Sequence, residues 1–389
     1  MQHGSDIMLS LFVIFVAAQI GAELARRLKS PGVCGEIAAG CVVGPSLFGW
    51  IVPSESLDML AEIGVVLLLF SVGLETRIDE MKRVGRSAFL VGVLGVIVPF
   101  VLGSLWAHGS GFEWDKSLFV AAAFVATSAG ITARVLQELG VLQRQESRVI
   151  LGAAVIDDIL AMLLLGIVTA LQSGEDVQLG KLVIVVLEAV GFVGVIGLVG
   201  TRLARRWAHL LGSLKLCSSL SVALALCLGL AFLSTQFGLA AIIGAFLAGM
   251  VASETPQRVT LEHQTQPLLA FMTPFFFVLT GTKIELAQLA NRDALLTLAL
   301  ITAIALVSKL IGGFLGALAL GKRSALIVGV GMMPRGEVGV VIASLGLAAG
   351  VFSPRTYALI VAMSLLTSVI TPPLLSILLK DDTEKPVSP

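Results

Sequence analysis

Two adjacent aspartates stand alone in a long apolar stretch of the sequence. Asp157 and Asp158 are the charged residues of the run from Val149 to Leu171. In a membrane-spanning helix both carboxylates lie roughly 14 to 15 Å from one end, near the middle of the bilayer. Burial favours the protonated form of a carboxylate, and the deprotonated form is a hard oxygen ligand for a small cation. Protons and cations then compete for one charge, which is the chemistry of coupled exchange.

A lysine in another apolar stretch offers a counter-charge. Lys309 lies in "LVSKLIGGFLG", too deep for its ammonium group to reach the membrane surface easily. Ionisable residues inside a membrane are paired and functional as a rule, so we expect Lys309 to pair with one aspartate. Neighbours on a helix point about 100° apart, which lets the other aspartate face a cavity. The alternative is a purely structural ion pair, but such a pair needs only one aspartate.

Two further apolar stretches contain residues that interrupt a helix. Thr127 and Ser128 lie in "ATSAGITA", and Pro334, Arg335 and Glu337 lie in "MMPRGEVG". Proline lacks the backbone N–H that a helix needs, and broken backbone inside a membrane persists only where protein or a water-filled cavity satisfies it. We expect the hydroxyl groups and the freed carbonyl groups to complete a cation site. The charged residues of the second interruption can offset partial charges at broken helix ends.

The composition indicates a membrane protein along the whole chain. Of 389 residues, 57% are hydrophobic and 13% are charged, against about 25% charged in soluble domains. Apolar stretches of about 20 residues recur from end to end, as expected of transmembrane helices, and they are continuous rather than alternating, which argues against a β-barrel. The net charge of zero gives no reason to expect a nucleic-acid partner, and the scattered cysteines and histidines imply no metal cofactor.

Hydropathy predicts an all-α polytopic protein with thirteen transmembrane helices. The spans lie near 7–25, 33–50, 57–75, 87–107, 117–135, 148–171, 181–202, 216–236, 238–253, 266–282, 294–320, 323–348 and 355–379. Basic residues gather in alternate connections, beginning with Arg26, Arg27 and Lys29 after the first span. This distribution predicts an N-terminus outside, a cytoplasmic C-terminus with a short tail at 381–389, and a first helix that is retained.

The second half of the sequence repeats features of the first. "VCGEIAAGCV" and "IIGAFLAGMV", "LLFSVG" and "FFVLTG", and the two interruptions recur at an offset of about 208 residues. Seven spans separate the copies, so they cross the membrane in opposite directions, as in inverted-repeat secondary transporters with two discontinuous, crossing helices. We predict a 6+1+6 arrangement, with repeats at about 7–171 and 216–379 and a linker helix at about 181–202. Chance similarity among small residues on helix-packing faces is the alternative.

Four segments resemble a known family of membrane transporters. "AAVIDD", "ATSAGITARVLQELGVL", "GVGMMPRGEVG" and "KLIGGFLGAL" resemble bacterial sodium/proton antiporters of the NapA type, in the monovalent cation:proton antiporter-2 branch of the cation/proton antiporter superfamily. The resemblance covers nearly the whole chain. It implies a homodimer in the bacterial inner membrane, surrounded by lipid, with one transport unit over 1–380. A core domain (about 57–171 and 266–379) is expected to move like an elevator past a dimerisation domain (about 7–50 and 181–253).

The resemblance also implies roles for individual residues. Asp158 matches the essential carboxylate that binds the ion and carries the proton, and Asp157 matches the aspartate that pairs with the helix-eleven lysine, here Lys309. Sodium is expected at Asp158, with Asp157 and Thr127 as further candidate ligands. The Asp-Asp pair resembles the electrogenic branch, which moves two protons per sodium. We expect no nucleotide-binding regulatory domain of the kind found in potassium-efflux relatives.

The sequence thus predicts a transporter rather than an enzyme, exchanging cytoplasmic Na+ or Li+ for external H+ without a cofactor. A K+/H+ antiporter of the same fold is the first alternative, because selectivity depends on cavity size and ligand geometry. A sodium-coupled symporter of organic anions is a distant alternative that the deep Lys309 and Arg335 leave open. An intramembrane aspartyl protease fits poorly, since neighbouring carboxylates on one helix diverge instead of sharing a proton.

Overall fold

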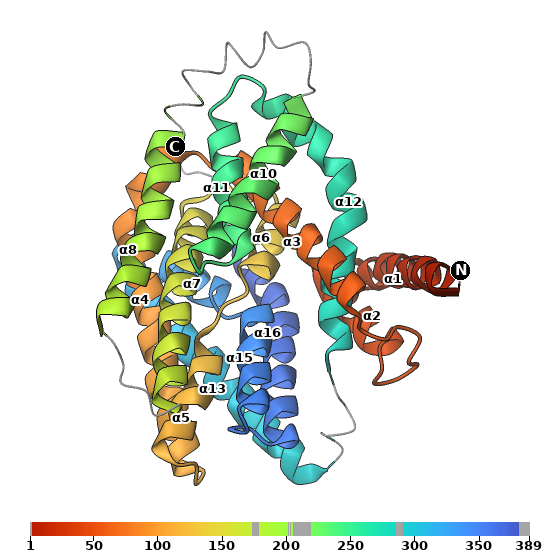
Figure 1. Cartoon of the computed structure of the whole chain (residues 1–389), viewed down its shortest axis with the longest axis vertical. Coiled ribbons are helices and arrows are strands. Elements are labelled where there is room, and N and C mark those ends of the chain that lie inside the picture. Colours follow the sequence, from red (N-terminus) through yellow and green to blue (C-terminus); the bar gives the residue numbers. More distant parts are fainter. Residues whose placement is uncertain are drawn as a thin grey trace.

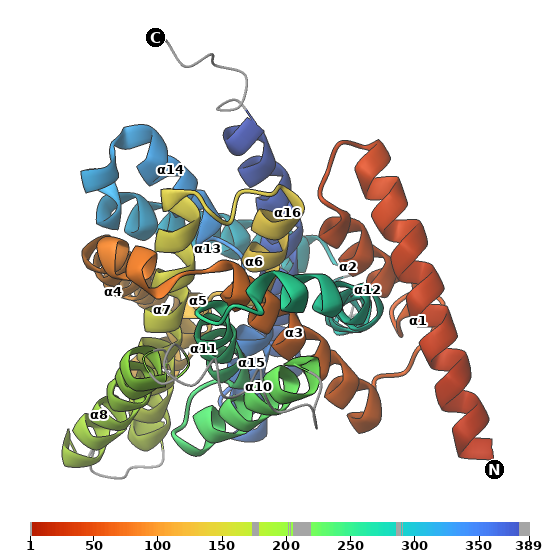
Figure 2. The ribbon, with the colours of Figure 1, turned by 90° about the horizontal axis from the view of Figure 1, so that it is seen from above.

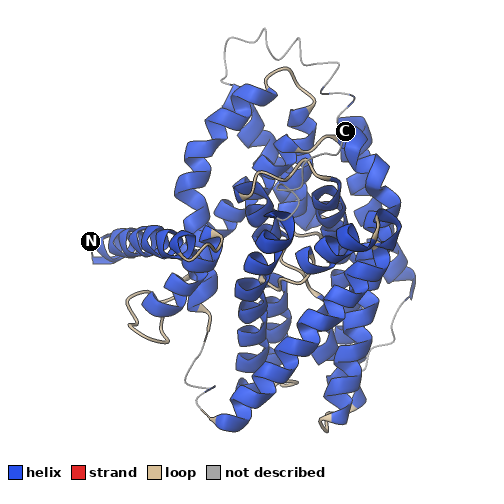
Figure 3. Ribbon diagram, turned by 180° about the vertical axis from the view of Figure 1, so that it is seen from behind, coloured by secondary structure: helices blue, strands red, loops and turns tan. Residues whose placement is uncertain are grey.

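The structure, a computed structural model, describes residues 2–172, 179–200, 219–284 and 291–380, together with 202, 204 and 289. Every regular element in this part of the chain is a helix (Figure 3). Eight helical segments are long and apolar enough to cross a membrane, one of them the interrupted segment Lys116–Glu138, and three shorter helices are also apolar. The predicted all-α class is therefore confirmed for the described residues.

A helix lies at each predicted span, but the helix that begins at Gly32 ends at Val43, seven residues before the end of its predicted span at residue 50. The first half contains α1 (Gln2–Arg27), α2 (Gly32–Val43), α3 (Glu55–Glu75), α4 (Ile78–Gly109), α5 (Trp114–Val125), α6 (Ala129–Glu138) and α7 (Gln145–Gln172). The second half contains α8 (Leu179–Val195), η1 (Ile196–Gly200), α10 (Ser219–Gln236), α11 (Ala241–Ser253), α12 (Arg258–Thr282), α13 (Arg292–Gly316), η3 (Leu318–Leu320), α14 (Lys322–Gly331), α15 (Glu337–Ala348) and α16 (Pro354–Lys380). The tail at 381–389 and the first residues of the predicted span at 216–236 lie outside the described residues. The count of thirteen crossings and their direction stay predictions.

Both predicted interruptions are present as breaks between short helices. Three non-helical residues separate α5 from α6, and five residues separate α14 from α15. Hydrogen bonds connect the two broken helices at the breaks. The Ser128 N–H donates to the carbonyl oxygen of Pro334 at 2.9 Å, and the Thr132 hydroxyl donates to that of Gly331 at 2.8 Å. The two broken helices thus meet at their breaks and satisfy part of each other's exposed backbone.

The helices contact one another in two groups. α1, α2, α3, α10, α11 and α12 form the first, which we name the α3 group. The second, the α4 group, contains α4, α5, α7, α13, α14, α15 and α16, with α6 continuing from α5 and touching α3. Seen from above, α1 lies at one edge of the molecule and α4 on the opposite side (Figure 2). α1 also projects from the side of the molecule, where the N-terminus lies (Figure 1).

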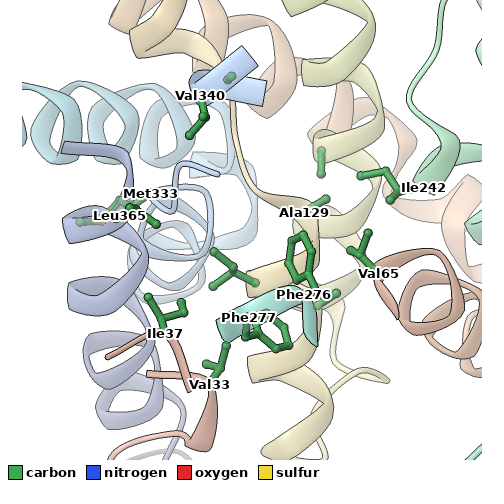
Figure 4. Close-up of a cluster of buried hydrophobic side chains, with 14 of the residues drawn as sticks. Val33, Ile37, Val65, Ala129, Ile242, Phe276, Phe277, Met333, Val340 and Leu365 are labelled. Carbon is green, nitrogen blue, oxygen red and sulfur yellow. The ribbon is translucent and has the colours of Figure 1, made fainter. Parts of the chain in front are cut away.

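Apolar side chains fill the region where the groups meet beside the first break. Val65, Ala129, Ile242 and Phe276 come from α3, α6, α11 and α12 and lie close together in Figure 4. Small residues let these helices approach closely. A Cβ atom on Gly249 would lie 2.1 Å from a backbone carbonyl oxygen of α3. Only glycine allows α11 to lie this close to α3, as is common between helices in membranes.

Candidate ion-binding site

Lys309 of α13 and Asp157 of α7 form a buried ion pair. The lysine Nζ lies 2.5 Å from the aspartate Oδ1, and neither side chain is exposed. Removing both charges from water is costly, and their attraction offsets this cost only when their other hydrogen-bonding positions are also filled. The surroundings of the ammonium group therefore decide whether the pair is sustainable.

Two backbone carbonyl groups fill the remaining donor positions of Lys309. Its Nζ donates to the oxygen of Gly95 at 2.7 Å and to that of Val125 at 2.8 Å. Val125 is the last residue of α5, so the break frees its carbonyl group. Gly95 lies within α4, four residues before Pro99, whose missing N–H leaves the Gly95 carbonyl without its usual helical partner. A break and a proline thus create the two acceptors that the buried ammonium needs.

Asp158 has a different environment from its neighbour. It lines a cavity of about 10 Å³, roughly the volume that holds one water molecule. The side chain is 4% exposed. The cavity is lined from α3, α6, α7 and α11 by Leu69, Ala129, Leu151, Ala154, Val155, Asp158, Ile242, Ile243 and Phe246. Asp158 therefore faces the boundary between the two helix groups, whereas Asp157 is enclosed within the α4 group.

Two buried oxygen atoms of the predicted cation ligands have no hydrogen-bond partner in the described part of the chain. They are the hydroxyl oxygen of Thr127, in the first break, and Oδ2 of Asp157. A buried polar oxygen without a partner is costly. Both atoms belong to the residues that the sequence marked as candidate cation ligands beside Asp158, and both oxygen types suit a hard cation.

Arg335 is the second fully buried cation of the site. Its guanidinium donates to the carbonyl oxygens of Val125 at 3.1 Å and Ala305 at 2.9 Å. The first contact puts a positive charge at the C-terminal end of α5, where the helix dipole is negative. The backbone of Arg335 is held by α16, since its N–H donates to the Thr367 hydroxyl at 3.0 Å and its carbonyl accepts from the Ser368 hydroxyl.

Three further predicted residues, Ser128, Pro334 and Glu337, lie in or beside the two breaks. Ser128 and Pro334 join the breaks through the backbone hydrogen bond described above. Glu337 is the first residue of α15, and its side chain lies outside the described part of the structure. The predicted residues from three separate regions of the sequence, at 127–128, 157–158 and 334–335, therefore meet around Lys309 and the first break.

Sequence reasoning missed two contributions to this site. Gly95 and Pro99 were not considered, although a proline inside an apolar helix always frees the carbonyl four residues earlier. The hydroxyl row of α16 was also missed. Its members are fully buried and share one helix face at spacings of three and four residues: Ser364, Thr367, Ser368 and Thr371. Two of them, Thr367 and Ser368, hold the backbone of Arg335 in the second break.

The sequence matches a known family over most of its length. The model of the family described as sodium/hydrogen exchanger, transmembrane, matches residues 11–381. The chain is 36% identical to the high-affinity Na+/H+ antiporter NhaS3 of Synechocystis sp., covering 95% of this chain and 89% of that protein. It is 34% identical to the Na+/H+-K+ antiporter GerN of Bacillus cereus, covering 95% of each chain.

A solved structure agrees with this relationship at the level of the fold. The sodium proton antiporter MjNhaP1 from Methanocaldococcus jannaschii superposes with a TM-score of 0.68 over 97% of both chains, at 18% sequence identity. The likeness supports the expected antiporter-type helical fold, and the family model together with the apolar helices supports the multi-pass membrane character. The matched family model and the two relatives together show that this chain belongs to the sodium/hydrogen exchanger transmembrane family.

Proposed function

We propose that this protein exchanges cytoplasmic Na+ or Li+ for external H+, with Asp158 as the carboxylate that binds either ion. One observation carries the proposal: two adjacent aspartates have opposite surroundings. Asp157 is paired with Lys309, while Asp158 lines a small cavity between the helix groups. Family membership and the named activities of NhaS3 and GerN support the same reading.

Competition at Asp158 couples the two ions. A sodium ion that reaches the cavity displaces the proton from the carboxyl group, and a returning proton displaces the sodium ion. The hydroxyl of Thr127 and Oδ2 of Asp157 are the further ligands we assign to sodium, because both oxygens are buried without hydrogen-bond partners. Because Asp158 offers one negative charge, it binds either a sodium ion or a proton at any one time. Binding of one ion therefore requires release of the other.

A second proton accounts for electrogenic exchange. When Asp157 turns toward the sodium ion, Lys309 loses its counter-charge, and burial then favours release of the ammonium proton. Two protons leave for each sodium ion that binds, which is the stoichiometry we propose. The reversal potential of sodium flux in proteoliposomes measures it: one net charge per sodium is expected, and electroneutral exchange contradicts the two-proton cycle.

Movement of one helix group past the other would give alternating access, in the elevator fashion that the family resemblance implies. Asp158 lies where α6 and α7 face α3 and α11, so sliding at this boundary carries the carboxylate from one side of the membrane to the other. The predicted core ranges, 57–171 and 266–379, include α3 and α12. α12 contacts both α2 and α3, and α3 also contacts α11. We therefore assign α3 and α12 to the stationary part.

We propose a homodimer in the bacterial inner membrane, with the N-terminus outside and the C-terminus in the cytoplasm. The concentration of basic residues in alternate connections supports this orientation. The apolar exposed face of α1 offers a surface for a second copy.

The decisive experiment replaces Asp158, the proposed ion-binding carboxylate. Asp158→Asn keeps the shape of the side chain but cannot ionise, so sodium-driven proton movement in proteoliposomes should fall to the level of protein-free vesicles. Asp58→Asn is a matched control, because Asp58 lies on α3 with 49% of its side chain exposed. It should exchange like the unmodified protein. Full activity of Asp158→Asn, in protein that elutes and melts normally, would falsify the proposal.

Potassium is the second candidate ion, favoured by the likeness to GerN, which is named for Na+, H+ and K+. Titrating Na+, Li+ and K+ separately against proton movement in the same vesicles distinguishes the ions. Saturation with Na+ or Li+ but not K+ is expected. If an organic anion were required for sodium movement, the symporter alternative would replace antiport.

A further inference from the structure

A buried carboxylate lies outside the ion-binding site, on α2. Glu36 is 4% exposed, and its Oε2 atom has no hydrogen-bond partner among the described residues. Most glutamates of the chain lie at helix ends, where water reaches them, but Glu36 is in the middle of a short apolar helix. A charged carboxylate with an unpaired oxygen is costly in such a place.

Charged residues from two neighbouring helices surround Glu36 without pairing fully with it. On α6, Arg134 forms an ion pair with Glu138 at 3.0 Å, so its charge is already engaged. The other oxygen of Glu138 accepts the N–H of Gly32, at the start of α2, at 3.0 Å. From α1, Arg26 approaches the same place, since a Cβ on Gly32 would lie 3.6 Å from its Nε. Both arginines attract the ionised form of Glu36, and Glu138 repels it.

The two other helices that contact α2 add no charge at this depth. α12 contains no ionisable residue between His263 and Lys283, and α16 contains none between Tyr357 and Lys380. α16 offers the backbone oxygen of Val369, which accepts from the thiol of Cys34 at 3.5 Å. The charge state of Glu36 is therefore set by burial, by the two arginines and by Glu138.

This cluster sits where the helix groups join. α2 belongs to the α3 group, while α6 and α16 belong to the α4 group. The hydrogen bond from Gly32 to Glu138 and that from Cys34 to Val369 both cross the junction. Separating α2 from α6 and α16 would break these contacts and admit water to Glu36.

We propose that Glu36 is a second proton-binding site, distinct from the aspartate pair, whose proton holds α2 against α6 and so keeps the two helix groups together. In the closed junction a proton neutralises the buried carboxylate. In the opened junction water solvates the charge and the proton leaves. Because the proton binds the closed arrangement more tightly, acid pH favours closure and alkaline pH favours opening.

The consequence for transport rests on the proposed antiport, but the proton-dependent junction does not. If the groups must slide for exchange, ionisation of Glu36 at alkaline pH releases them. Exchange would then speed up when the cell interior becomes alkaline, through a group that never contacts the transported ion.

Hydrogen–deuterium exchange of the full chain in detergent tests the junction without transport. Amide exchange in residues 30–37 is compared across mildly acidic to alkaline pH, after correction for the intrinsic pH dependence of exchange. In the unmodified protein we expect protection to fall as pH rises. In Glu36→Gln, which mimics the protonated form, protection should persist at all pH values. Glu62→Gln, an exposed carboxyl on α3, is the matched control and should behave like the unmodified protein.

Proteoliposome assays then test the regulatory role. Glu36→Gln should lose the alkaline rise in exchange rate, whereas Glu62→Gln keeps it. Identical protection and identical pH profiles for Glu36→Gln and the unmodified protein would overturn the proposal. If the unmodified protein shows the Glu36-dependent change in protection but no cation exchange, the proposed function fails and the proton site stands.

A second variant covers the case in which Glu36→Gln does not fold. Glu138→Gln keeps an oxygen that can accept from Gly32 but releases Arg134, which then stabilises ionised Glu36. The loss of protection should shift to lower pH than in the unmodified protein. An unchanged midpoint, or a shift to higher pH, contradicts the assignment of Glu36 as the titrating group.

Discussion

At the scale of single residues, the central feature is how completely Lys309 is satisfied. Its three donor positions meet Asp157, Gly95 and Val125. Buried ion pairs contribute little to stability in total, but removing one partner leaves a buried charge alone and costs about 3–5 kcal/mol. The pair therefore fixes the positions of Lys309 and Asp157 but contributes little to the overall stability of the fold. Thermal melting of single and double variants can separate these two effects.

Lys309→Met should lower the melting temperature clearly, because Asp157 and two carbonyl oxygens lose their donor. Adding Asp157→Asn to Lys309→Met should restore much of the loss, since the unpaired carboxylate is removed. Thermal melting of the four proteins in detergent gives the coupling between the residues. If the stability losses of the two single variants add up to the loss of the double variant, Lys309 and Asp157 are not energetically coupled, despite their contact at 2.5 Å.

The depth of the charged residues could be predicted from the sequence, but their acceptors could not. Counting along apolar runs put Asp157, Asp158 and Lys309 near mid-membrane. Which aspartate meets the lysine came from family resemblance, because periodicity places neighbours on different faces without saying which face is turned inward. The Gly95 and Val125 carbonyl groups depend on how α4 and α5 lie against α13, which no local pattern encodes.

At the scale of elements, the breaks matter because they expose backbone groups at a fixed place. The carbonyl of Val125 accepts from both buried cations, and the proline in α4 exposes a further carbonyl opposite it. The interruptions themselves were predictable from proline, glycine and hydroxyl residues. Their mutual contact was predicted only as a consequence of the repeat.

Pro99→Ala would restore the missing N–H in α4, which then competes with Lys309 for the Gly95 carbonyl. We expect a loss of about 1 kcal/mol, the size of one hydrogen bond, seen as a lower melting temperature. In a Lys309→Met background the same substitution should cost nothing or stabilise the protein. An equal loss in both backgrounds would show that Pro99 acts independently of the lysine.

Gly336→Ala tests the close approach of the two breaks. A Cβ at this position would lie 2.5 Å from both Cβ and Oγ of Ser128, so the breaks must separate. We expect about 1–3 kcal/mol of destabilisation and slower exchange in proteoliposomes. Ser128→Gly in the same chain should recover part of both losses. Gly85→Ala, on α4 with open space around it, should neither destabilise the protein nor slow exchange.

At the scale of the whole molecule, the boundary between the helix groups organises the function. Asp158 and Glu36 both lie at this boundary, on α7 and α2, while the ion pair lies inside one group. The predicted domain ranges, which rest on the family resemblance, include α3 and α12 in the core, whereas we assign both helices to the stationary part from their contacts. Contacts across a boundary depend on long-range arrangement, which hydropathy does not report.

The outer face of α1 predicts where two copies meet. Leu9, Phe12 and Ile20 are 62%, 63% and 57% exposed, and the last two line a groove of about 590 Å³ between α1 and α2. Cysteine introduced at each position in turn, in a cysteine-free chain, should crosslink copies in the native membrane at one position or more. Phe89→Cys, on α4 and 56% exposed, is the control. Crosslinking at Phe89 alone would place the dimer contact elsewhere.

The burial of Arg335 has a consequence for how membrane voltage acts on the cycle. Of the charged side chains described here, Arg335, Lys309, Asp157 and Asp158 share the site. In the proposed cycle their sum with sodium bound and Lys309 neutral is zero, and with both protons bound it is plus one. The voltage, worth about 2.3 kcal/mol per charge at about 100 mV, then drives only the proton-bearing step. Without the arginine the sums would be minus one and zero, and the field would act on the sodium-bearing step instead.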